Sequence, residues 1–527
     1  MPEYLAPGVY TEEISTGPVP IEGVSTSTAG FAGLTERGPT AVRLITSLRE
    51  FERWYGGPIA ASYLPDAVKG FFDNGGQRVF VARVTRPNAQ PSAVTIGTDG
   101  DDLVLEAAGP GNLDGHLFVQ VGAASRRDPA NPRQSDPARF QLRILYYSVA
   151  PPSPLVDPFD RANLRNANRR DPDVTEIWDD LSADPLSSSY ALTVVQQSQL
   201  VRISSTSTGK PAAGGWTAFT GGADGDAVTL TEFLGAGQPA TGLEALRQID
   251  EISLLCVPDE VNADLLPGPA RDGIRDALVV QCEELKDRFA VLQVDRGQSN
   301  VNAIDPPLTS SYAAIYYPWL RIFDPLTQDT RLVPPGGHVV GVYAATDIQR
   351  GVHKAPANVD LRGIVTRDLP GDRKPLEFLV NKRQQDILNP KGINVVRDFR
   401  ADRRGIRVWG ARTLSADAQW KYVNVRRLFI FVEESIDEGV QWVVFEGNYE
   451  ATWDRVVRSI SNFLTSVWRS GALMGTRPED AFFVRCDRTT MTQQEIDTGQ
   501  LVCYIGLAAV KPAEFVILRY SHKTSEE

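Results

Sequence analysis

Two acidic residues that could act as a general acid and base follow one of the most apolar segments of the sequence. Asp259 and Glu260 come directly after the run ISLLCVP at 252–258. The carboxyl ends of strands are where α/β enzymes commonly carry catalytic groups. The alternative is that both carboxylates lie in a solvated loop before the next helix. We favour this alternative, because CVPDEVNADLLPG at 256–268 lacks the G-x-G-x-x-G pattern of a dinucleotide-binding turn.

The residue types that bind phosphates or metal ions do not occur at the spacings that such binding sites require. In STGKPAAGG at 207–215, a proline follows the lysine, and the upstream glycine of a phosphate-binding loop is absent. The histidines and cysteines show neither metal-ligand nor C-x-x-C spacing; they are His116, His338, His353, His522, Cys256, Cys282, Cys486 and Cys503. We expect the cysteines to be buried, reduced thiols. The sequence therefore predicts no catalytic residue, no metal and no cofactor.

One stretch of the chain is rich in arginine. RDFRADRRGIRVWGAR at 397–412 contains six arginines and two aspartates, although the formal net charge of the whole chain is −12. One hypothesis is ion pairing within the subunit and between subunits, and the other is electrostatic contact with a different partner. The candidate interface charges are Arg397, Arg400, Arg403, Arg404 and Arg407.

The overall composition predicts a folded protein with more than one domain. Its 527 residues are 42% hydrophobic, which is enough for two or more cores. The acidic balance argues against direct nucleic-acid binding, which needs a cationic surface. The start MPEYLAPG lacks the features of a signal peptide, and no apolar run approaches the roughly 20 residues of a membrane span. We expect cytoplasmic assembly and no membrane insertion by this chain.

The first half of the chain shows α/β patterning interrupted by a β-rich region. The segment 27–84 predicts a strand, two helices and a strand, whereas 91–226 contains short alternating segments separated by Asp, Pro and Gly. The segment 251–295 then predicts a βαβ unit. We therefore predict one discontinuous α/β domain, formed by 26–90 and 227–365, with 91–226 as an inserted, mostly β outer domain.

The strongest helix pattern in the chain lies at 449–470, after another predicted helix at 424–439. Asn448 is the expected N-cap and Gly471 the expected stop. Apolar residues recur at steps of three and four; they are Tyr449, Trp453, Val456, Val457, Ile460, Phe463, Leu464, Val467 and Trp468. Arginines on the opposite face of this helix contact either solvent or a partner.

Both ends of the chain have the pattern of strands without a neighbour. YLAPGVYTEEIS at 4–15 contains Pro7, which excludes a regular helix. The residues 515–520 form an unbroken β-favouring run followed by a short polar tail. Each segment is predicted to pair with a sheet elsewhere.

Several motifs from the two ends and the last third of the chain occur together in a characteristic order. They are PGVYTEEI, GFAGLTERGP, VPPGGHVVGVYAATDIQRGVHKAPAN, INVVRDFRADRRGIRVWGARTL, VRRLFIFVEESI and CYIGLAAVKPAEFVILRY. In this combination the chain resembles the sheath subunit of contractile phage tails and of phage-tail-like contractile injection systems. The resemblance covers both ends and most of 330–520, whereas 91–226 resembles no family.

The resemblance implies a structural protein rather than an enzyme. Such a subunit polymerises as a helical tube around an inner tube and contracts to drive that tube through a target envelope. The implied fold is a multidomain α+β or α/β architecture. Besides the discontinuous core and its insertion, it has a linker arm at 1–25, a tube-facing C-terminal sheath domain at 366–510 and a donated strand with its tail at 511–527.

The resemblance also implies which residues meet other proteins. Strand donation to neighbouring subunits would involve Val9, Tyr10, Thr11, Glu12, Phe515, Val516, Ile517, Leu518, Arg519 and Tyr520. Our candidates for inner-tube contact are Arg455, Arg458, Asn462 and Arg469. The implied partners are other copies of the chain in stacked hexameric rings, the inner-tube protein, the baseplate and the terminator or cap proteins.

Two alternatives from other classes stay open at this point. One is a hydrolase or nucleotide-binding enzyme on the βαβ core, and the other is a surface-binding protein that uses 91–226. An enzyme predicts a thermal shift on ligand binding and discrete oligomers. A sheath subunit predicts tubes whose assembly depends on both termini.

Overall fold

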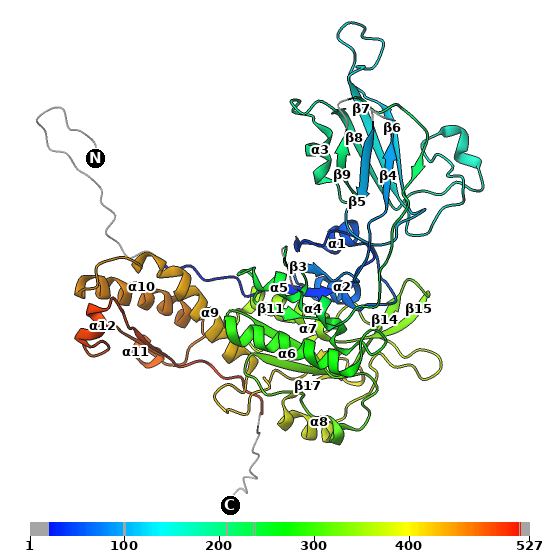
Figure 1. Ribbon diagram of the computed structural model, residues 1–527. Coiled ribbons are helices and arrows are strands. Elements are labelled where there is room, and N and C mark those ends of the chain that lie inside the picture. Colours follow the sequence, from blue (N-terminus) through cyan, green and yellow to red (C-terminus); the bar gives the residue numbers. More distant parts are fainter. Residues whose placement is uncertain are drawn as a thin grey trace, which may run out of the picture. The chain divides into compact units, whose positions relative to one another are not determined.

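A computed structural model of the chain describes residues 20–97, 102–206, 209–235, 237, 239–515 and 517 (Figure 1). The chain divides into two compact units. The larger unit contains 25–426, and the smaller unit joins the described parts of 1–24 and 427–527. We describe each unit separately.

A nine-stranded mixed sheet organises the larger unit. In spatial order its strands are β16 (Val359–Asp360), β18 (Ile406–Val408), β17 (Ile393–Asp398), β13 (Ala313–Tyr317), β12 (Phe289–Gln293), β11 (Leu254–Cys256), β1 (Thr28–Gly33), β3 (Arg78–Arg83) and β2 (Arg43–Ile45). The strands from β17 to β3 are parallel, and antiparallel strands flank them at both sides. A parallel sheet of this kind requires cover on both faces.

Successive side chains of each strand point to opposite faces of the sheet, so apolar side chains emerge on both faces. Helices cover both faces and bury these side chains. In β1, the Phe31 ring meets the Phe71 ring of α2 with centroids 5.7 Å apart. Its neighbour Ala32 belongs to the core cluster that α5 and α6 complete. Outside the predicted insertion, the helices of this unit are α1 (Leu48–Tyr55), α2 (Leu64–Asp73), α4 (Leu230–Leu234), α5 (Gly242–Arg247), α6 (Gly268–Leu285), α7 (Gly336–Arg350) and α8 (Lys382–Leu388) (Figure 1).

The helices α2 and α7 pack so closely that glycines form the contact. A Cβ atom on Gly337 would lie 2.4 Å from the Ala67 carbonyl oxygen, and one on Gly341 would lie 2.5 Å from the Phe71 carbonyl oxygen. From the other side, a Cβ atom on Gly70 would meet the His338 ring at 2.4 Å. The backbones approach at positions where any larger side chain would separate the helices.

The predicted βαβ unit is confirmed, since β11 and β12 are parallel neighbours connected through α6. The strands on either side of the predicted insertion also share this sheet. The predicted boundary at 366 lies inside the larger unit, because β17 and β18 extend the sheet beyond β13. A hairpin of β14 (Leu320–Asp324) and β15 (Asp329–Val333) projects from this unit.

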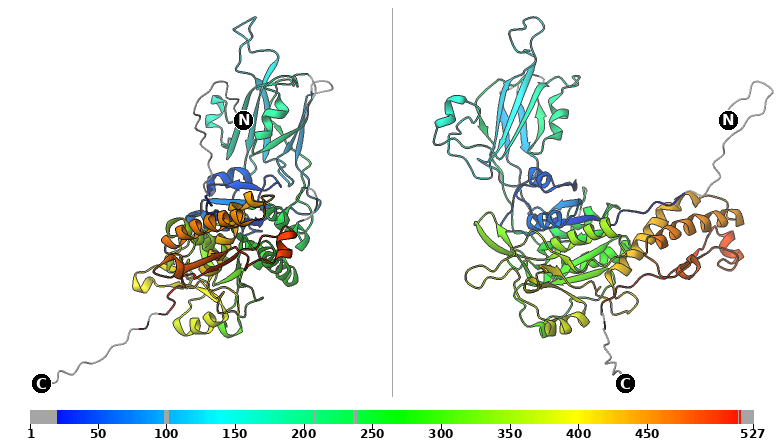
Figure 2. Two further views of the ribbon diagram at one scale, coloured as in Figure 1. Left: turned by 90° about the vertical axis from the view of Figure 1, so that its left-hand side faces the viewer. Right: turned by 180° about the vertical axis from the view of Figure 1, so that it is seen from behind.

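The segment between β3 and α4 contributes two sheets of its own. One contains β4 (Ala93–Ile96), β5 (Leu103–Ala107) and β9 (Val201–Thr206); the other contains β10 (Thr217–Ala218), β6 (Leu117–Ala123), β7 (Arg139–Tyr146) and β8 (Val174–Ser182). Their apolar faces share one core cluster, which also includes residues of α3 (Ala191–Val194). These strands form a separate body, coloured cyan to green in Figure 2.

Polar contacts connect this body to the central sheet at its base. The buried Arg83 side chain donates to the carbonyl oxygens of Gly38 and Pro110, the latter at 2.8 Å. The Tyr146 hydroxyl donates to Glu36. The two crossing segments also pair with each other. The Gln90 backbone amide donates to the Ala223 carbonyl oxygen at 2.9 Å, and the Ala223 amide donates to the Gln90 carbonyl oxygen at 3.0 Å.

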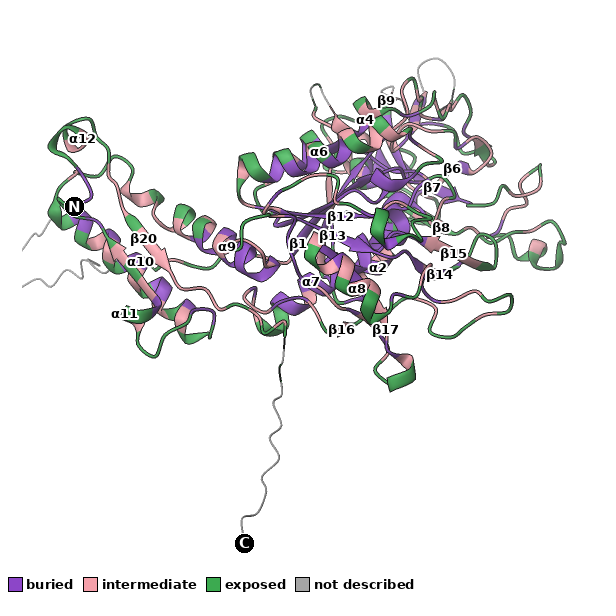
Figure 3. Cartoon of the chain, turned by 90° about the horizontal axis from the view of Figure 1, so that it is seen from below, coloured by how far each residue is buried: buried purple, intermediate pink, exposed green. Residues whose placement is uncertain are grey.

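The smaller unit consists of helices and one short sheet. The helix α9 (Val423–Gly439) leads into it, followed by α10 (Glu450–Arg469), α11 (Pro478–Ala481) and α12 (Gln493–Asp497). The sheet contains β19 (Phe482–Arg485) and β20 (Tyr504–Leu507). The apolar stripe of α10 is confirmed for Trp453, Ile460 and Leu464 among others, which are buried (Figure 3). Its predicted first member, Tyr449, is instead 52% exposed.

Asn448 is not the N-cap of α10, because Tyr449 occupies that position without a capping side chain. The Asn448 side chain instead accepts a hydrogen bond from the Trp453 indole at 2.8 Å and donates to the Gln500 carbonyl oxygen at 2.9 Å. It therefore ties the start of α10 to the segment before β20. The predicted stop is correct to one residue, since Ser470 is the C-cap and Gly471 follows with a positive φ of 84°.

Candidate assembly surfaces

The two-stranded sheet of the smaller unit offers edges for additional strands. β19 and β20 pair from Phe482 with Leu507 to Arg485 with Tyr504. Among the described residues, no third strand joins this sheet. α10 contacts β19, whereas Phe483 and Tyr504 are 56% and 58% exposed. An isolated two-stranded sheet is only marginally stable, and in this unit α10 packs against one of its strands.

The chain that leaves β20 follows this unit briefly and then becomes exposed. The Met474 amide donates to the Ala508 carbonyl oxygen at 2.7 Å, and the Val510 amide donates to that of Ala472 at 3.1 Å. Farther on, Phe515 and Ile517 are 68% and 76% exposed and lie outside any assigned strand. The other predicted strand-donation residues fall outside the described part of the chain: Val9, Tyr10, Thr11, Glu12, Val516, Leu518, Arg519 and Tyr520.

The described end of the N-terminal arm lies along α9. The Val24 amide donates to the Ser435 hydroxyl at 3.1 Å. Ile21 approaches Gly439 so closely that a Cβ atom there would lie 2.7 Å from its side chain. These contacts fix the point from which the arm departs.

The four candidates for inner-tube contact differ in their surroundings. Arg458, Asn462 and Arg469 are exposed at spacings that place them on one side of α10. The Arg455 guanidinium instead pairs with Glu446 at 3.0 Å and stacks 4.7 Å from the centre of the Trp442 ring. Arg455 therefore supports the loop between α9 and α10, and the other three candidates define the accessible face.

The arginine-rich stretch forms several contacts inside the larger unit. Arg407 pairs with Asp360 at 2.9 Å. Arg397 and Arg404 stack on the Phe399 ring at 4.7 Å and 5.1 Å from its centre. The pair of Arg407 with Asp360 supports the hypothesis of ion pairing within the subunit, whereas Arg403 is exposed.

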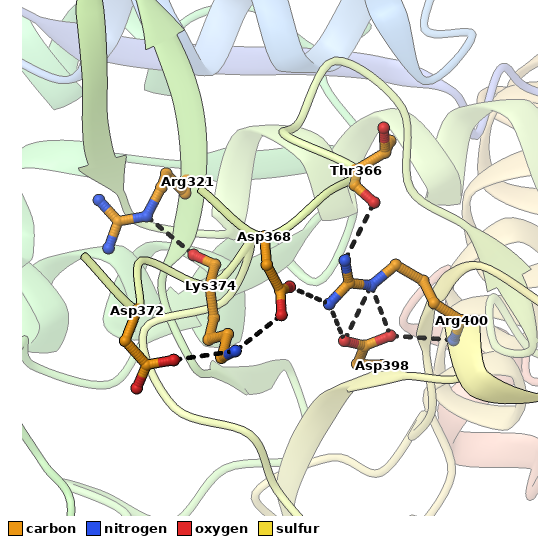
Figure 4. A network of polar contacts seen from close by, with 7 residues as sticks. All are labelled: Arg321, Thr366, Asp368, Asp372, Lys374, Asp398 and Arg400. Atoms are coloured by element: carbon orange, nitrogen blue, oxygen red, sulfur yellow. Dashed lines mark hydrogen bonds and ion pairs between the residues drawn. The ribbon is translucent and has the colours of Figure 1, made fainter. Parts of the chain in front are cut away.

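Arg400 is the centre of the largest ion-pair network in this region (Figure 4). Its guanidinium contacts Asp398 at 2.6 Å and Asp368 at 2.8 Å, and Asp368 also binds Lys374 at 2.7 Å. These carboxylates raise the pKa of Arg400 above its already high ordinary value, and the largest cause is the hydrogen bonds that Arg400 donates to Asp398. Asp368 and Lys374 lie outside the arginine-rich stretch, so the sequence run alone did not identify them as partners.

Asp259 and Glu260 are both fully buried, so the prediction of a solvated loop is wrong. They lie in a short 3-10 helix, Pro258–Val261, at the carboxyl end of β11. Asp259 accepts hydrogen bonds from the Ser62 hydroxyl at 2.5 Å, the Tyr63 amide at 2.9 Å and the Asn262 amide group at 3.0 Å. Burial raises the pKa of Asp259 and these donors oppose the rise. The carboxylate thus holds the start of α2 against the sheet.

Glu260 binds the neighbouring strand in a similar way. Its carboxylate accepts from the Gln293 backbone amide at 2.7 Å and from the Gln293 side chain at 3.0 Å. Burial raises the pKa of Glu260 to about 8, and the charge of Arg275 only partly counters this effect. Both acidic residues are therefore occupied by structural hydrogen bonds.

Two further properties concern the described residues only. No group of three His, Cys, Asp or Glu side chains is arranged to hold a metal ion in that part of the chain. None of its helices combines the length and the apolar character of a membrane span.

The fold agrees with the family to which the chain is similar in sequence. The family described as "Phage tail sheath protein central domain" matches residues 250–414, and "Phage tail sheath C-terminal domain" matches 415–522. Together these matches cover more than half of the chain, and the chain belongs to the phage tail sheath family. It is a structural subunit of the contractile sheath of a phage tail or tail-like injection particle.

Relatives and solved structures extend the similarity along most of the chain. The tail sheath protein of Burkholderia phage BcepMu is 24% identical over 535 aligned positions, covering 96% of this chain and 94% of that protein. The tail sheath protein of Escherichia phage P2 is 24% identical over 183 positions, 34% of this chain and 44% of that protein. The contracted PVC sheath of an extracellular contractile injection system has a TM-score of 0.59 at 23% identity and covers 99% of both chains.

Proposed function

We propose that subunits of this sheath are joined by strand donation. In this proposal, the segment containing Val9–Glu12 and the segment Phe515–Tyr520 leave their own subunit and extend the β19–β20 sheets of neighbouring subunits. The contact partners would be other copies in stacked rings, an inner-tube protein, the baseplate and the terminator or cap. The observation that carries the proposal is the two-stranded sheet, which has no third strand among the described residues.

The lengths of the terminal segments are compatible with this arrangement. The chain before residue 20 can span roughly 60 Å when extended, at about 3.3 Å per residue. Its departure point is held against α9 by Val24 and Ile21. A donated strand adds a few backbone hydrogen bonds, each contributing about 1 kcal/mol net. Many such links in one lattice act together, and they allow subunits to rotate while staying connected.

We expect a chain that ends at Lys511 to fold and yet fail to form tubes. The truncation removes Phe515–Tyr520 and leaves β19 and β20 in place, so it deletes the strand that we propose is donated. The measurement is negative-stain electron microscopy of the purified protein, with circular dichroism to verify folding. A control chain that ends at Ser521 keeps the strand and should form tubes like the full chain. Normal tubes from the shorter chain would refute donation by this segment.

We propose that the exposed side of α10 contacts the inner tube, with Arg458 at its centre. R458E reverses a charge that is exposed on the folded subunit, so we expect at least a tenfold loss of extended, tube-filled sheath with little effect on subunit stability. The measurement is the yield of filled particles after co-expression with the tube protein. R161E, at an exposed arginine of the inserted body, is the matched control. Equal yields for both variants would contradict this assignment.

We propose that the subunit has no catalytic role. This proposal is supported by the two acidic residues at the end of β11, whose buried carboxylates are bound by Ser62, Tyr63, Asn262 and Gln293. A sheath assembled in a high-energy extended state can contract without a nucleotide site, because the energy is stored in its packing.

A further inference from the structure

The cysteines Cys486 and Cys503 lie at the same end of the β19–β20 sheet. The register pairs Arg485 with Tyr504, so the next position along both strands places Cys486 opposite Cys503. Directly opposed residues of antiparallel strands have Cα atoms about 4.5 to 5.5 Å apart. Disulfides span Cα distances of about 4.4 to 6.8 Å. The expected spacing of the two Cα atoms is therefore compatible with a disulfide between Cys486 and Cys503.

The two thiols are free and differ in accessibility. Cys486 is 5% exposed and Cys503 is half-buried, contrary to the expectation that all four cysteines are buried. Both belong to a small cluster that includes Trp453 and Met491. Cys256 and Cys282, by contrast, are buried in the larger unit.

We propose that Cys486 and Cys503 are a reversible redox pair, which closes to a cross-strand disulfide by exchange with a small-molecule disulfide such as oxidised glutathione. The half-buried Cys503 is the attacking thiol, and the buried Cys486 is the resolving thiol. The difference in exposure supports this order, because the half-buried Cys503 is the thiol that a disulfide in solution can reach. This inference goes beyond the proposed function and does not depend on strand donation.

The reaction takes place in two exchange steps. The Cys503 thiolate attacks one sulfur of oxidised glutathione, which forms a mixed disulfide and releases one glutathione thiolate. Cys486 then loses its proton and attacks the Cys503 sulfur, which releases the second glutathione. The two protein thiols lose two electrons and two protons, and one glutathione disulfide is reduced to two glutathione thiols.

The bond would join the two ends of the segment that contains α12. Closing a loop of this size restricts the unfolded chain. In the reducing cytoplasm the pair would be open, and in an oxidising medium outside the cell it would close. The sheet that we propose receives donated strands would then be stabilised only after release of the particle.

The test titrates the full-length protein with mixtures of reduced and oxidised glutathione, followed by alkylation and peptide mass spectrometry. We expect one disulfide, between Cys486 and Cys503. Cys256 and Cys282 should remain thiols during the titration and should be recovered as alkylated peptides. In the oxidised protein, amide hydrogen exchange between the two cysteines should slow at least tenfold. Reduced thiols throughout the titration, or a stable glutathione adduct on Cys503 beside a free Cys486, would overturn the proposal.

Single substitutions distinguish the two roles. C486S should accumulate glutathione on Cys503, because the resolving thiol is missing. C503S should leave Cys486 unmodified, because that thiol is buried. The opposite pattern would refute the assigned order. If C486S yields too little folded protein, the rate of alkylation at each cysteine in the wild-type chain decides the same question. We expect Cys503 to react at least tenfold faster than Cys486. Equal rates would refute the order.

Discussion

The double substitution G337A/G341A is expected to leave little stable, soluble subunit. Each added methyl group would lie about 2.5 Å from a backbone atom of α2, and backbone cannot move aside as a flexible side chain can. Overpacking of this kind costs typically about 1 to 3 kcal/mol per site. The gain in helix propensity from glycine to alanine, about 1 kcal/mol per site, is smaller. Both added methyl groups would meet backbone atoms, so we expect the upper end of the overpacking range at each site and a combined net loss of about 4 kcal/mol.

The measurement is the midpoint of thermal unfolding of the protein from the soluble fraction. The control is G268A at the start of α6, where the added methyl group would meet only Arg271, at 3.9 Å. This variant should unfold at the wild-type temperature or slightly above it. An unchanged midpoint in the double variant would show that α2 and α7 separate at little cost, contrary to the packing described here.

The variant E260Q is expected to be several kcal/mol more stable than the wild-type chain at pH 9 and similar to it at pH 4. The pKa of Glu260 is about 8 in the folded chain, against an ordinary value of 4.5. The folded state therefore holds this proton more tightly than the unfolded state. The resulting stability is fully present below pH 4.5 and is lost as the pH rises through 8. A shift of this size corresponds to at most about 5 kcal/mol.

Glutamine can accept the same hydrogen bonds from Gln293 without carrying a charge, so it should remove this part of the pH dependence. The measurement is the free energy of unfolding of both chains between pH 4 and pH 9. E284Q, at an exposed glutamate of α6, serves as the control and should follow the wild-type curve. Parallel curves for E260Q and the wild type would mean that Glu260 is ionised in the folded chain across this range.

Local patterns in the sequence predicted those elements whose signals are contained within a few turns or strands. The βαβ unit follows from two apolar runs and a helical stripe between them, and the structure contains it as β11, α6 and β12. The helix α10 likewise follows from its own periodicity. Such patterns determine which face of an element is buried, because that depends only on the spacing of apolar residues.

Contacts between distant segments could not be predicted in this way. The neighbour of β13 is β17, although more than 70 residues separate them, so the predicted boundary at 366 falls inside the larger unit. Asp259 is buried because Ser62 and Tyr63 supply hydrogen bonds from nearly 200 residues away. No feature near Asp259 in the sequence indicates these donors.

The positions of Cys486 and Cys503 next to two strand-forming runs are a sequence signal for their proximity. Cys486 directly follows the short apolar run AFFVR, and Cys503 directly precedes YIGL. An antiparallel hairpin of these two runs brings the cysteines together in one register. Their separation of more than a dozen residues does not match a C-x-x-C motif, which is why spacing alone did not identify them.

The two segments that connect the inserted body to the core are paired through Gln90 and Ala223, and this feature makes the body exchangeable. A module whose own ends lie side by side can replace residues 91–222 without lengthening either connection or disturbing the order of the central strands. The same junction is a suitable position for grafting a reporter or a targeting domain onto an engineered particle.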